Sequence, residues 1–390
     1  MKISACIAAL LAIGTFSSEA APVQNENKVI RVPLVRNPDF KRNVTAQVLK
    51  AQNKHHKLLF SSVSDTLAAT IPVVDYANDL EYYGIVEVGT PPVSLRLDFD
   101  TGSSDLWFAS TLCEVCTGQN LFDPDKSSTY RKDGTPWLVE YGNENDLNWA
   151  LGIVGYDTVN LGGVAIKNQA IELAQDESGG FQGGPNDGLF GLAFDRLLSV
   201  SGIKTPIDNL VSQNLISKPI FGVFLGEKTS GGGGEYVFGG YDESHIDGPL
   251  KTIPIDNSDG YWGINIDGTT IGGKSISSSF SGILDTGTTL LLLPSDVFQN
   301  VADAYGSKHV GGGTYTIPCD TSGLEPLKFS IGGAEFQIPP ESLNFDKRGD
   351  QCIAGFSNGG NAAIFGDVFL KNYYVIFNQE VPEVQIAPVK

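Results

Sequence analysis

The 390-residue sequence is poor in positive charge: it has 26 lysines and arginines against 45 aspartates and glutamates, and its formal net charge is −19. Such a chain lacks the basic surface that binds nucleic-acid phosphates or the headgroups of anionic membranes. Beyond its first residues it also lacks an apolar run long enough to cross a bilayer, and its C-terminus has no hydrophobic tail for a lipid anchor. We therefore expect no nucleic-acid partner and no membrane partner.

Histidine is also scarce, with four residues in the whole chain and only His245 and His309 beyond residue 69. The stretch Gly355–Gly359 matches the nucleophile elbow of serine hydrolases, but no histidine follows Ser357 to complete the triad. Histidine-based metal sites fail for the same reason, and we expect neither a metal nor a cofactor. Gly268–Ser275 satisfies the phosphate-loop pattern, yet poor helix formers follow it, so we expect a β-hairpin there.

Glycine and proline, by contrast, are abundant, with 46 and 20 residues. They separate short segments of alternating polar and apolar residues, such as Gly84–Val88 and Leu250–Ile255, a pattern typical of β-strands. Helical patterns are limited to short stretches around Ile207–Gln213 and Pro294–Tyr305. With 41% hydrophobic residues the chain can form a core, and we predict an all-β protein with few short helices.

The N-terminus has the features of a secretory signal peptide. Lys2 precedes an apolar run from Ile3 to Ile13, and small residues follow up to Ala20. The run is too short for a transmembrane helix. We therefore expect residues 1–20 to be a signal peptide and the protein to be secreted to the extracellular space. A vacuolar location is the alternative, for which the sequence offers no address.

Charge is unevenly distributed along the chain. Residues 22–70 contain eight basic and three acidic residues, a net charge of +5, and because the signal peptide is neutral the rest carries −24. A basic segment before an acidic body predicts a pro-segment, residues 21–68, that docks by charge; the alternative is a flexible basic tail. Val29–Val35 alternates like a strand with one core face, which favours docking. The acidic body also predicts greatest stability at mildly acid pH.

Cysteine usage is consistent with export. Cys6 belongs to the signal peptide, which leaves four cysteines and three pairings for two disulfides. Proximity in sequence favours Cys113–Cys116 and Cys319–Cys352. A zinc half-site or a redox pair is the alternative for the first two cysteines, but the second ligand pair and the βαβ context that these sites need are missing.

The body of the chain contains a weak internal repeat. Leu97–Ser104 is echoed by Gly282–Thr289, and in both an apolar segment leads into Asp-Thr-Gly followed by two hydroxyl residues. A second pair of similar stretches follows at comparable offsets, Gly188–Leu192 and Ala363–Asp367. Two copies of one plan predict two similar lobes related by a pseudo-twofold axis.

The repeat places one aspartate in each lobe, Asp100 and Asp285. If the lobes meet at the axis, the two carboxyl groups face each other and share a proton, because two adjacent charges cannot both form cheaply. The ionised group can take a proton from water while the protonated one polarises an amide carbonyl. Ser103 and Thr288 can bond the outer carboxylate oxygens. This chemistry hydrolyses an amide without a covalent intermediate.

Asp100–Trp107 together with Asp285–Thr289 resembles the pepsin family of aspartic peptidases, in which such a proton-sharing pair is found. Further similarity extends over the whole chain and is greatest to rhizopuspepsin-type secreted fungal aspartic proteases. It includes Ser110–Cys113, Gly231–Asp242 and Val381–Pro388.

The resemblance implies a bilobal, pepsin-like fold with a cleft between an N-terminal lobe, residues 69–245, and a C-terminal lobe, residues 246–390. It implies a secreted aspartic endopeptidase, monomeric and made as a zymogen, that cleaves extended polypeptides at acid pH and is inhibited by its own propeptide. The alternative is a catalytically inactive binding protein on the same fold, which the two intact Asp-Thr-Gly motifs disfavour.

The resemblance also assigns roles to individual residues. Asp100 and Asp285 are the expected catalytic pair, and Tyr141 is expected to bond Trp107 and line the first specificity pocket beneath a flap hairpin. The flap tip, Asn143–Ala150, is longer and more acidic than is usual, which predicts altered specificity or a harmless insertion. The expected substrate-binding residues are Tyr141, Gly142, Gly102, Gly287, Thr288 and Asp98, and those supporting the pair are Thr101, Ser103, Thr286 and Trp107.

Two of these expectations leave alternatives open. Asp98 lies two residues before Asp100 and so on the same strand face; it either lines the cleft or is a satisfied polar residue of the strand. By resemblance, a pro-segment lysine, Lys54 or Lys57, blocks the catalytic pair until the carboxylates are protonated. The alternative is that these lysines only aid solubility.

Overall fold

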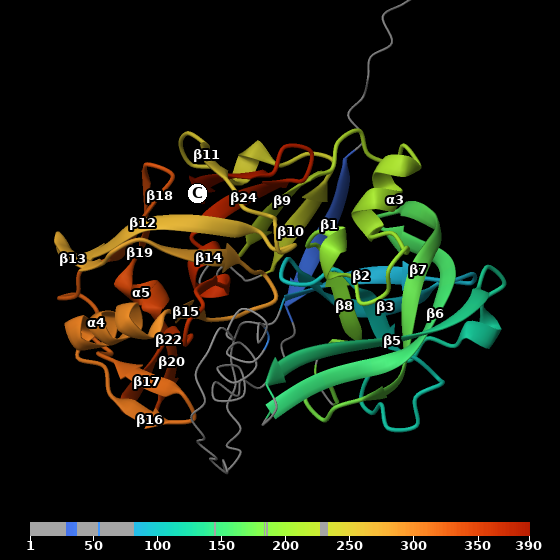
Figure 1. Cartoon of the computed structure of the whole chain (residues 1–390), viewed down its shortest axis with the longest axis horizontal. Helices are drawn as coiled ribbons and strands as arrows, with labels where there is room; N and C mark the ends of the chain where they lie inside the picture. Colours follow the sequence, from blue (N-terminus) through green and yellow to red (C-terminus); the bar gives the residue numbers. More distant parts are fainter. Residues whose placement is uncertain are drawn as a thin grey trace, which may run out of the picture.

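The computed structural model describes residues 29–36, 54, 82–143, 146–182, 184, 186–226 and 233–390. Across these residues strands predominate, helices are short, and the strands form two lobes that lie side by side (Figure 1). The all-β, bilobal architecture expected from the sequence is therefore confirmed. In this described part of the chain, no helix combines the length and apolar character needed to cross a membrane.

The largest sheet within these ranges has 13 strands and draws on both ends of the chain. The C-terminal strands β24 and β25 pair beside β9, so the end of the chain returns to the sheet that contains β1. Its strands are β1 (Ile30–Arg36), β2 (Tyr82–Val88), β3 (Val93–Asp100), β4 (Leu106–Ala109), β5 (Arg131–Asn143), β6 (Asp146–Leu161), β7 (Val164–Glu177), β8 (Gly188–Gly191), β9 (Ile220–Leu225), β10 (Gly234–Phe238), β11 (Lys251–Pro254), β24 (Tyr373–Asn378) and β25 (Glu383–Pro388).

The lobe that contains β12 to β23 is built from two further sheets. The larger contains β12 (Gly263–Ile271), β13 (Lys274–Ser277), β14 (Phe280–Leu284), β15 (Leu291–Leu293), β18 (Leu327–Ile331), β19 (Ala334–Ile338), β22 (Phe356–Asn358) and β23 (Ile364–Phe365). The smaller contains β16 (His309–Gly311), β17 (Thr314–Ile317), β20 (Asn344–Arg348) and β21 (Gln351–Ala354). The phosphate-loop match forms the β12–β13 hairpin, as expected, with Gly272 and Gly273 at positive φ in its turn.

Both expected helices are present. In α3 (Pro206–Ser212) the Thr205 side chain accepts a hydrogen bond from Asp208 N, and the Asp208 side chain bonds the Thr205 backbone in return, which stabilises the start. The helix α4 (Ser295–Tyr305) ends at Gly306, whose left-handed conformation favours glycine. The described chain also forms the single-turn helices α5 (Pro340–Leu343) and α6 (Asp367–Leu370), and the 3₁₀ turns η1 (Pro124–Lys126), η2 (Asp195–Leu197) and η4 (Glu243–His245).

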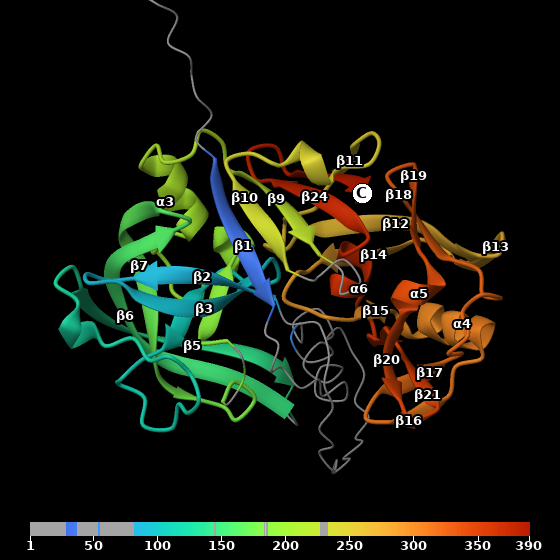
Figure 2. The ribbon, with the colours of Figure 1, turned by 180° about the vertical axis from the view of Figure 1, so that it is seen from behind.

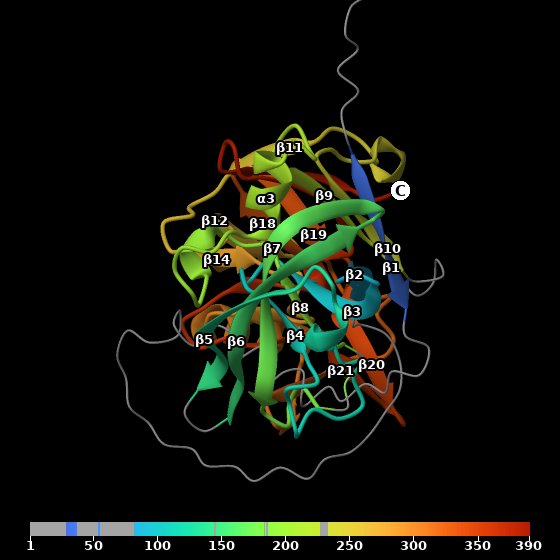
Figure 3. The same ribbon diagram turned by 90° about the vertical axis from the view of Figure 1, so that its right-hand side faces the viewer.

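The strand β1 confirms the alternation seen in the sequence. Ile30, Val32 and Leu34 are buried, whereas Arg31 and Pro33 between them are exposed. β1 lies between β10 and β2 and pairs antiparallel with both, so it is an interior strand of the large sheet. Figure 2 shows it alongside β10 where the two lobes meet, and Figure 3 shows the same strand from the side.

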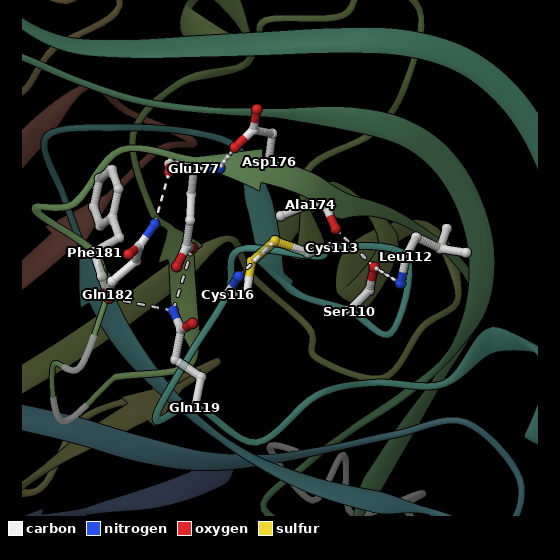
Figure 4. The surroundings of a disulfide bond; sticks show 10 residues. All are labelled: Ser110, Leu112, Cys113, Cys116, Gln119, Ala174, Asp176, Glu177, Phe181 and Gln182. Carbon is white, nitrogen blue, oxygen red and sulfur yellow. Dashed lines mark hydrogen bonds between the residues drawn. A yellow bond between two sulfur atoms is a disulfide. The ribbon is translucent and has the colours of Figure 1, made fainter.

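The four remaining cysteines form the two disulfides that sequence proximity favours, Cys113–Cys116 and Cys319–Cys352. Around the first of these, Ser110 Oγ donates to Ala174 O at 2.7 Å, which ties the disulfide loop to β7 (Figure 4). The second links the segment after β17 to β21 and spans 33 residues of sequence.

The two disulfides should contribute unequally to stability. In the loop-entropy account, replacing Cys319 and Cys352 with serine lowers the free energy of unfolding by about 4 kcal/mol, because a long loop is released in the unfolded chain. The matched replacement of Cys113 and Cys116 releases a loop of three residues and costs about 2 kcal/mol. Urea unfolding of both double variants measures the difference. A larger loss from the short loop would contradict this ranking.

Candidate active site

Asp100 and Asp285 occupy equivalent places in the two lobes. Asp100 is the last residue of β3 and lies opposite Gly191 of β8, which runs parallel to β3. On its other side β8 pairs antiparallel with β4. Asp285 directly follows β14, which runs parallel to β23, while β15 pairs antiparallel with β23. The second pair of repeated stretches, 188–192 and 363–367, thus supplies the parallel neighbours of the strands that lead to the aspartates.

Reciprocal hydrogen bonds join the two Asp-Thr-Gly turns across the lobe boundary. The Thr101 hydroxyl donates to Leu284 O at 3.0 Å and accepts from Thr286 N at 2.9 Å. The Thr286 hydroxyl donates to Phe99 O at 2.6 Å and accepts from Thr101 N at 3.0 Å. The exchange has the symmetry of a twofold axis, and both threonines are buried. It holds the two aspartates at fixed positions relative to each other.

The carboxylate of Asp100 is held by its own turn. Its Oδ1 accepts from Gly102 N at 2.8 Å, and its Oδ2 accepts from Ser103 Oγ at 2.5 Å. Because both oxygens accept hydrogen bonds and the side chain is fully buried, the plane of the carboxylate is fixed. Because this geometry is already set, no free energy is needed to reorient the carboxylate during a reaction.

The second turn repeats this arrangement. Oδ1 of Asp285 accepts from Gly287 N at 3.0 Å, and Oδ2 accepts from the Thr288 hydroxyl. A Cβ atom at position 287 would collide with the ammonium group of Lys54 and the carboxylate of Asp100. The site therefore requires glycine here so that two carboxylates and a ligand can fit between the turns.

Lys54 Nζ lies between the two carboxylates, 2.6 Å from Asp100 Oδ1 and 3.0 Å from Asp285 Oδ1, and its side chain is only 3% exposed. Burial by itself lowers the pKa of Lys54. The charges of Asp100, Asp285 and Asp98 outweigh burial and raise this pKa above its usual value. Of the two candidate lysines, Lys54 is the one at the carboxylates; Lys57 lies outside the described residues.

The two buried carboxyl groups are related by the twofold axis, and their inner oxygens both contact one atom, Lys54 Nζ. Two groups placed in this way can both act on a single small molecule that lies between them. A family described as eukaryotic aspartyl protease matches residues 81–389, most of the chain. The chain belongs to the eukaryotic aspartyl protease family. It is accordingly an aspartic-type endopeptidase, a hydrolase whose family acts on polypeptides.

Individual members of the aspartyl protease family are similar over nearly the whole chain. Rhizopuspepsin-2 of Rhizopus niveus is 56% identical over 99% of this chain and 98% of its own length. Syncephapepsin of Syncephalastrum racemosum is 51% identical over 100% of both chains. Pepsin A of Canis lupus familiaris is 33% identical over 94% of this chain and 97% of its own. The likeness to rhizopuspepsin-type fungal proteases that the sequence indicated is confirmed.

In this aspartyl protease an aromatic cluster of Trp107, Tyr141 and Phe181 lies beside the Asp-Thr-Gly turn of Asp100. Trp107 Nε1 donates to the Tyr141 hydroxyl at 3.0 Å, and Phe181 packs edge-on against both rings. Tyr141 is buried, and burial followed by the charges of nearby aspartates raises its pKa well above the usual value. The hydroxyl therefore stays protonated. Its contribution to substrate binding remains a prediction.

The flap is the hairpin of β5 and β6, in which Gly142 pairs with Leu147. Its tip at residues 144–145 lies outside the described residues. At the base of the lengthened segment, Ser178 Oγ donates to Asn148 Oδ1 at 3.1 Å, which connects the flap to the end of β7. The predicted effect of the altered tip on specificity rests on the sequence alone.

Two further carboxyl groups lie near Asp100 and Asp285. Asp98 on β3 is buried, and its charge acts on Lys54. Asp367, at the start of α6, was not expected; its pKa is raised well above the usual value by burial, then by the charges of Asp98 and Asp285. The sequence held one signal for it, because the repeated stretch ends in Gly366-Asp367 where the first copy has leucine after glycine.

Sequence reasoning also missed two buried carboxyl groups, Asp105 and Glu172, near Tyr141 of the aromatic cluster. The carboxyl groups of Asp105 and Glu172 lie near enough for the charge of one to act on the other, and both are almost fully buried. Ser199 links them, since its N–H donates to Asp105 Oδ1 at 2.8 Å and its hydroxyl donates to Glu172 Oε1 at 3.2 Å. Burial raises the pKa of both groups, and the charge of Asp105 raises that of Glu172 further.

This pair should make the fold less stable as the pH rises. A carboxyl group whose pKa is raised by folding holds its proton in the folded state and loses it in the unfolded chain. Above the ordinary glutamate pKa, each pH unit over which only the folded state keeps the Glu172 proton costs about 1.4 kcal/mol. We expect Glu172→Gln to flatten the fall of the melting temperature towards neutral pH.

Thermal unfolding across this pH range, in an Asp285→Asn background that prevents self-cleavage, measures the effect. Glu140→Gln removes an exposed carboxylate on β5 and serves as the control. Equal slopes for the two variants would contradict the assignment of the acid pair.

Proposed function

We propose that this aspartic peptidase is made as a secreted zymogen and acts at acid pH through water activated between Asp100 and Asp285. The observation that carries the proposal is the position of Lys54 Nζ, within 3.0 Å of the inner oxygens of both carboxylates. In the proposed organisation, residues 1–20 are the signal peptide and residues 21–68 the inhibitory propeptide. The mature monomer comprises lobes 69–245 and 246–390.

In the mature enzyme, once Lys54 has left, the inner oxygens of Asp100 and Asp285 can hold a water molecule between them. The ionised carboxylate takes a proton from the water as its oxygen attacks the amide carbon, and the protonated carboxyl group gives its proton to the carbonyl oxygen. The tetrahedral diol then breaks its C–N bond as a proton passes to the leaving nitrogen. Gly102 and Gly287, through their N–H groups, keep Asp100 and Asp285 aligned during both steps.

Lys54 supplies the inhibition. Its ammonium group fills the place between the carboxylates and is stabilised there only while they carry negative charge. Acid protonates the carboxylates, and a buried ammonium group without its partners is strongly destabilised. Release at acid pH therefore follows from the same ion pairs that block the site at neutral pH.

A second contact fastens the propeptide strand β1. Arg31 Nη1 lies 2.6 Å from Asp242 Oδ2 and 3.0 Å from Glu235 Oε1, and its side chain is half exposed. Exposed ion pairs contribute only about 0.2–1 kcal/mol to stability. The buried ion pairs of Lys54 therefore hold the propeptide more strongly than those of Arg31. Glu235, Asp242 and His245 have a spacing that suits a metal ion, but Arg31 occupies the carboxylates.

Secretion is supported by the signal peptide and by the two disulfides, which persist in oxidising compartments. The acidic composition supports work at acid pH, where repulsion within the body is reduced.

Conversion of the purified precursor tests the proposal. At about pH 3.5, below the ordinary carboxyl pKa values, we expect it to lose its N-terminal segment and then digest a denatured protein. Asp100→Asn should do neither. If the wild-type precursor fails in both respects and the variant behaves identically, the inactive binding protein becomes the better account. If the variant instead converts and digests as an active wild type does, the reaction does not proceed through Asp100.

A further inference from the structure

A small pocket lies on the Asp285 lobe. It is formed by the paired ends of β12 and β14, the loop before β12 and the segment just before β23, and its volume is about 200 Å³. Sites for small molecules usually measure about 300–1,000 Å³. The pocket is therefore of a size to receive one amino-acid side chain.

Its lining combines an apolar floor with negative charge. Ile264 and Ala363 contribute apolar surface, and Asp256 and Asp259 contribute two carboxylates. Lysine, arginine and histidine are absent from the described residues that line it. The Ser258 hydroxyl and N–H group lower the pKa of Asp256, so this carboxylate keeps its charge in mildly acid solution.

The pocket is close to the catalytic pair. Ile283, one of its lining residues, precedes Asp285 by two positions, a separation of about 7 Å along extended backbone. Tyr261 also lines it, and burial together with the charge of Asp285 raises the pKa of this tyrosine to about 12. A polypeptide bound in extended form, with its scissile bond at Asp285, can place a side chain in this pocket.

We propose that the pocket selects a basic side chain of the polypeptide substrate, within three residues of the scissile bond. Lysine and arginine match it because their methylene stems pack on apolar surface while the charged head stays near solvent. Asp256 and Asp259 are exposed residues of the lining, so their carboxylates can pair with a head group that stays near solvent. This inference rests on the proposed function, since it names a substrate feature read by the same cleft.

Paired peptides test it with the mature enzyme. Each pair has lysine or norleucine, which lacks only the ammonium group, at one of the three positions on either side of the bond. At one position we expect lysine to raise kcat/KM about fivefold, the size of a charge contact at a partly exposed site. Asp259→Asn and Asp256→Asn should bring the ratio towards one, and Asp259→Lys should favour glutamate instead.

Asp267→Asn is the matched control, because it removes an exposed carboxylate from β12 outside the pocket lining and should keep the lysine preference. The dissociation constants of the same peptides with Asp285→Asn give a readout that needs no turnover. A lysine preference absent at every position, or unchanged in Asp259→Asn, overturns the pocket. Loss of turnover with an intact binding preference would instead count against the proposed function.

Discussion

Replacing Asp285 with asparagine in the mature enzyme should lower kcat by about 10⁴-fold and leave KM nearly unchanged. Asparagine has the size of aspartate. Its amide oxygen can still accept from Gly287 N, and its NH2 group can donate to the Thr288 hydroxyl oxygen. It cannot exchange a proton with water or with the carbonyl oxygen. The loss therefore falls on the chemical step, and steady-state rates on one peptide before and after the change measure it.

The same reasoning predicts that the two aspartates act as a unit. If they share one proton, the double variant Asp100→Asn/Asp285→Asn should be no slower than either single variant. Asp267→Asn, an exposed change on β12, should retain wild-type kcat. A double variant slower by the product of the two single effects would show that the aspartates contribute independently, against the shared mechanism.

Replacing Lys54 with methionine should make the intact precursor active at a pH at which the wild-type precursor is still blocked, because the two carboxyl groups can then share their proton without first releasing an ammonium group. Methionine retains the length of the side chain without its charge. Breaking a buried ion pair costs about 3–5 kcal/mol, which corresponds to release of the site by about 10²–10⁴-fold. Initial rates on a short peptide, with the precursor shown to be uncleaved on a gel, measure the change.

Lys57→Met is the matched control for this experiment. It removes an equal charge three residues away in the same basic segment and should leave the precursor inactive. If the Lys57→Met precursor were active and the Lys54→Met precursor inactive, Lys57 would be the blocking residue. If both precursors stayed inactive, neither lysine would maintain the block.

The sequence predicted the catalytic turns because their signals are local. An apolar strand that leads into Asp-Thr-Gly fixes the position of Asp100 on its own, and the second copy does the same for Asp285. The alternation in β1 likewise gave its buried face. Such patterns establish that a strand exists, but they do not name its partners. The return of β24 and β25 to the sheet of β9 and β1 therefore required the structure.

Single acidic residues were beyond sequence reasoning for a related reason. Glu172 stands in an apolar stretch of β7, like many exposed acids in strands, and its burial beside Asp105 is what distinguishes it. Asp367 departs from the repeat at one position, but its burial near Asp98 and Asp285 required the structure. Lys54 and Lys57 lie in one basic run. The contact of Lys54 with the carboxylates depends on where the chain passes them, which neither composition nor periodicity encodes.

The threonine exchange at the lobe boundary has a mechanical consequence. Its four hydrogen bonds lie where the catalytic turns meet, so this contact is the natural pivot for any rocking of one lobe against the other. A rotation about a pivot moves distant points most and the pivot itself least. Parts of the lobes far from this contact can therefore shift while the separation of Asp100 and Asp285 stays nearly constant.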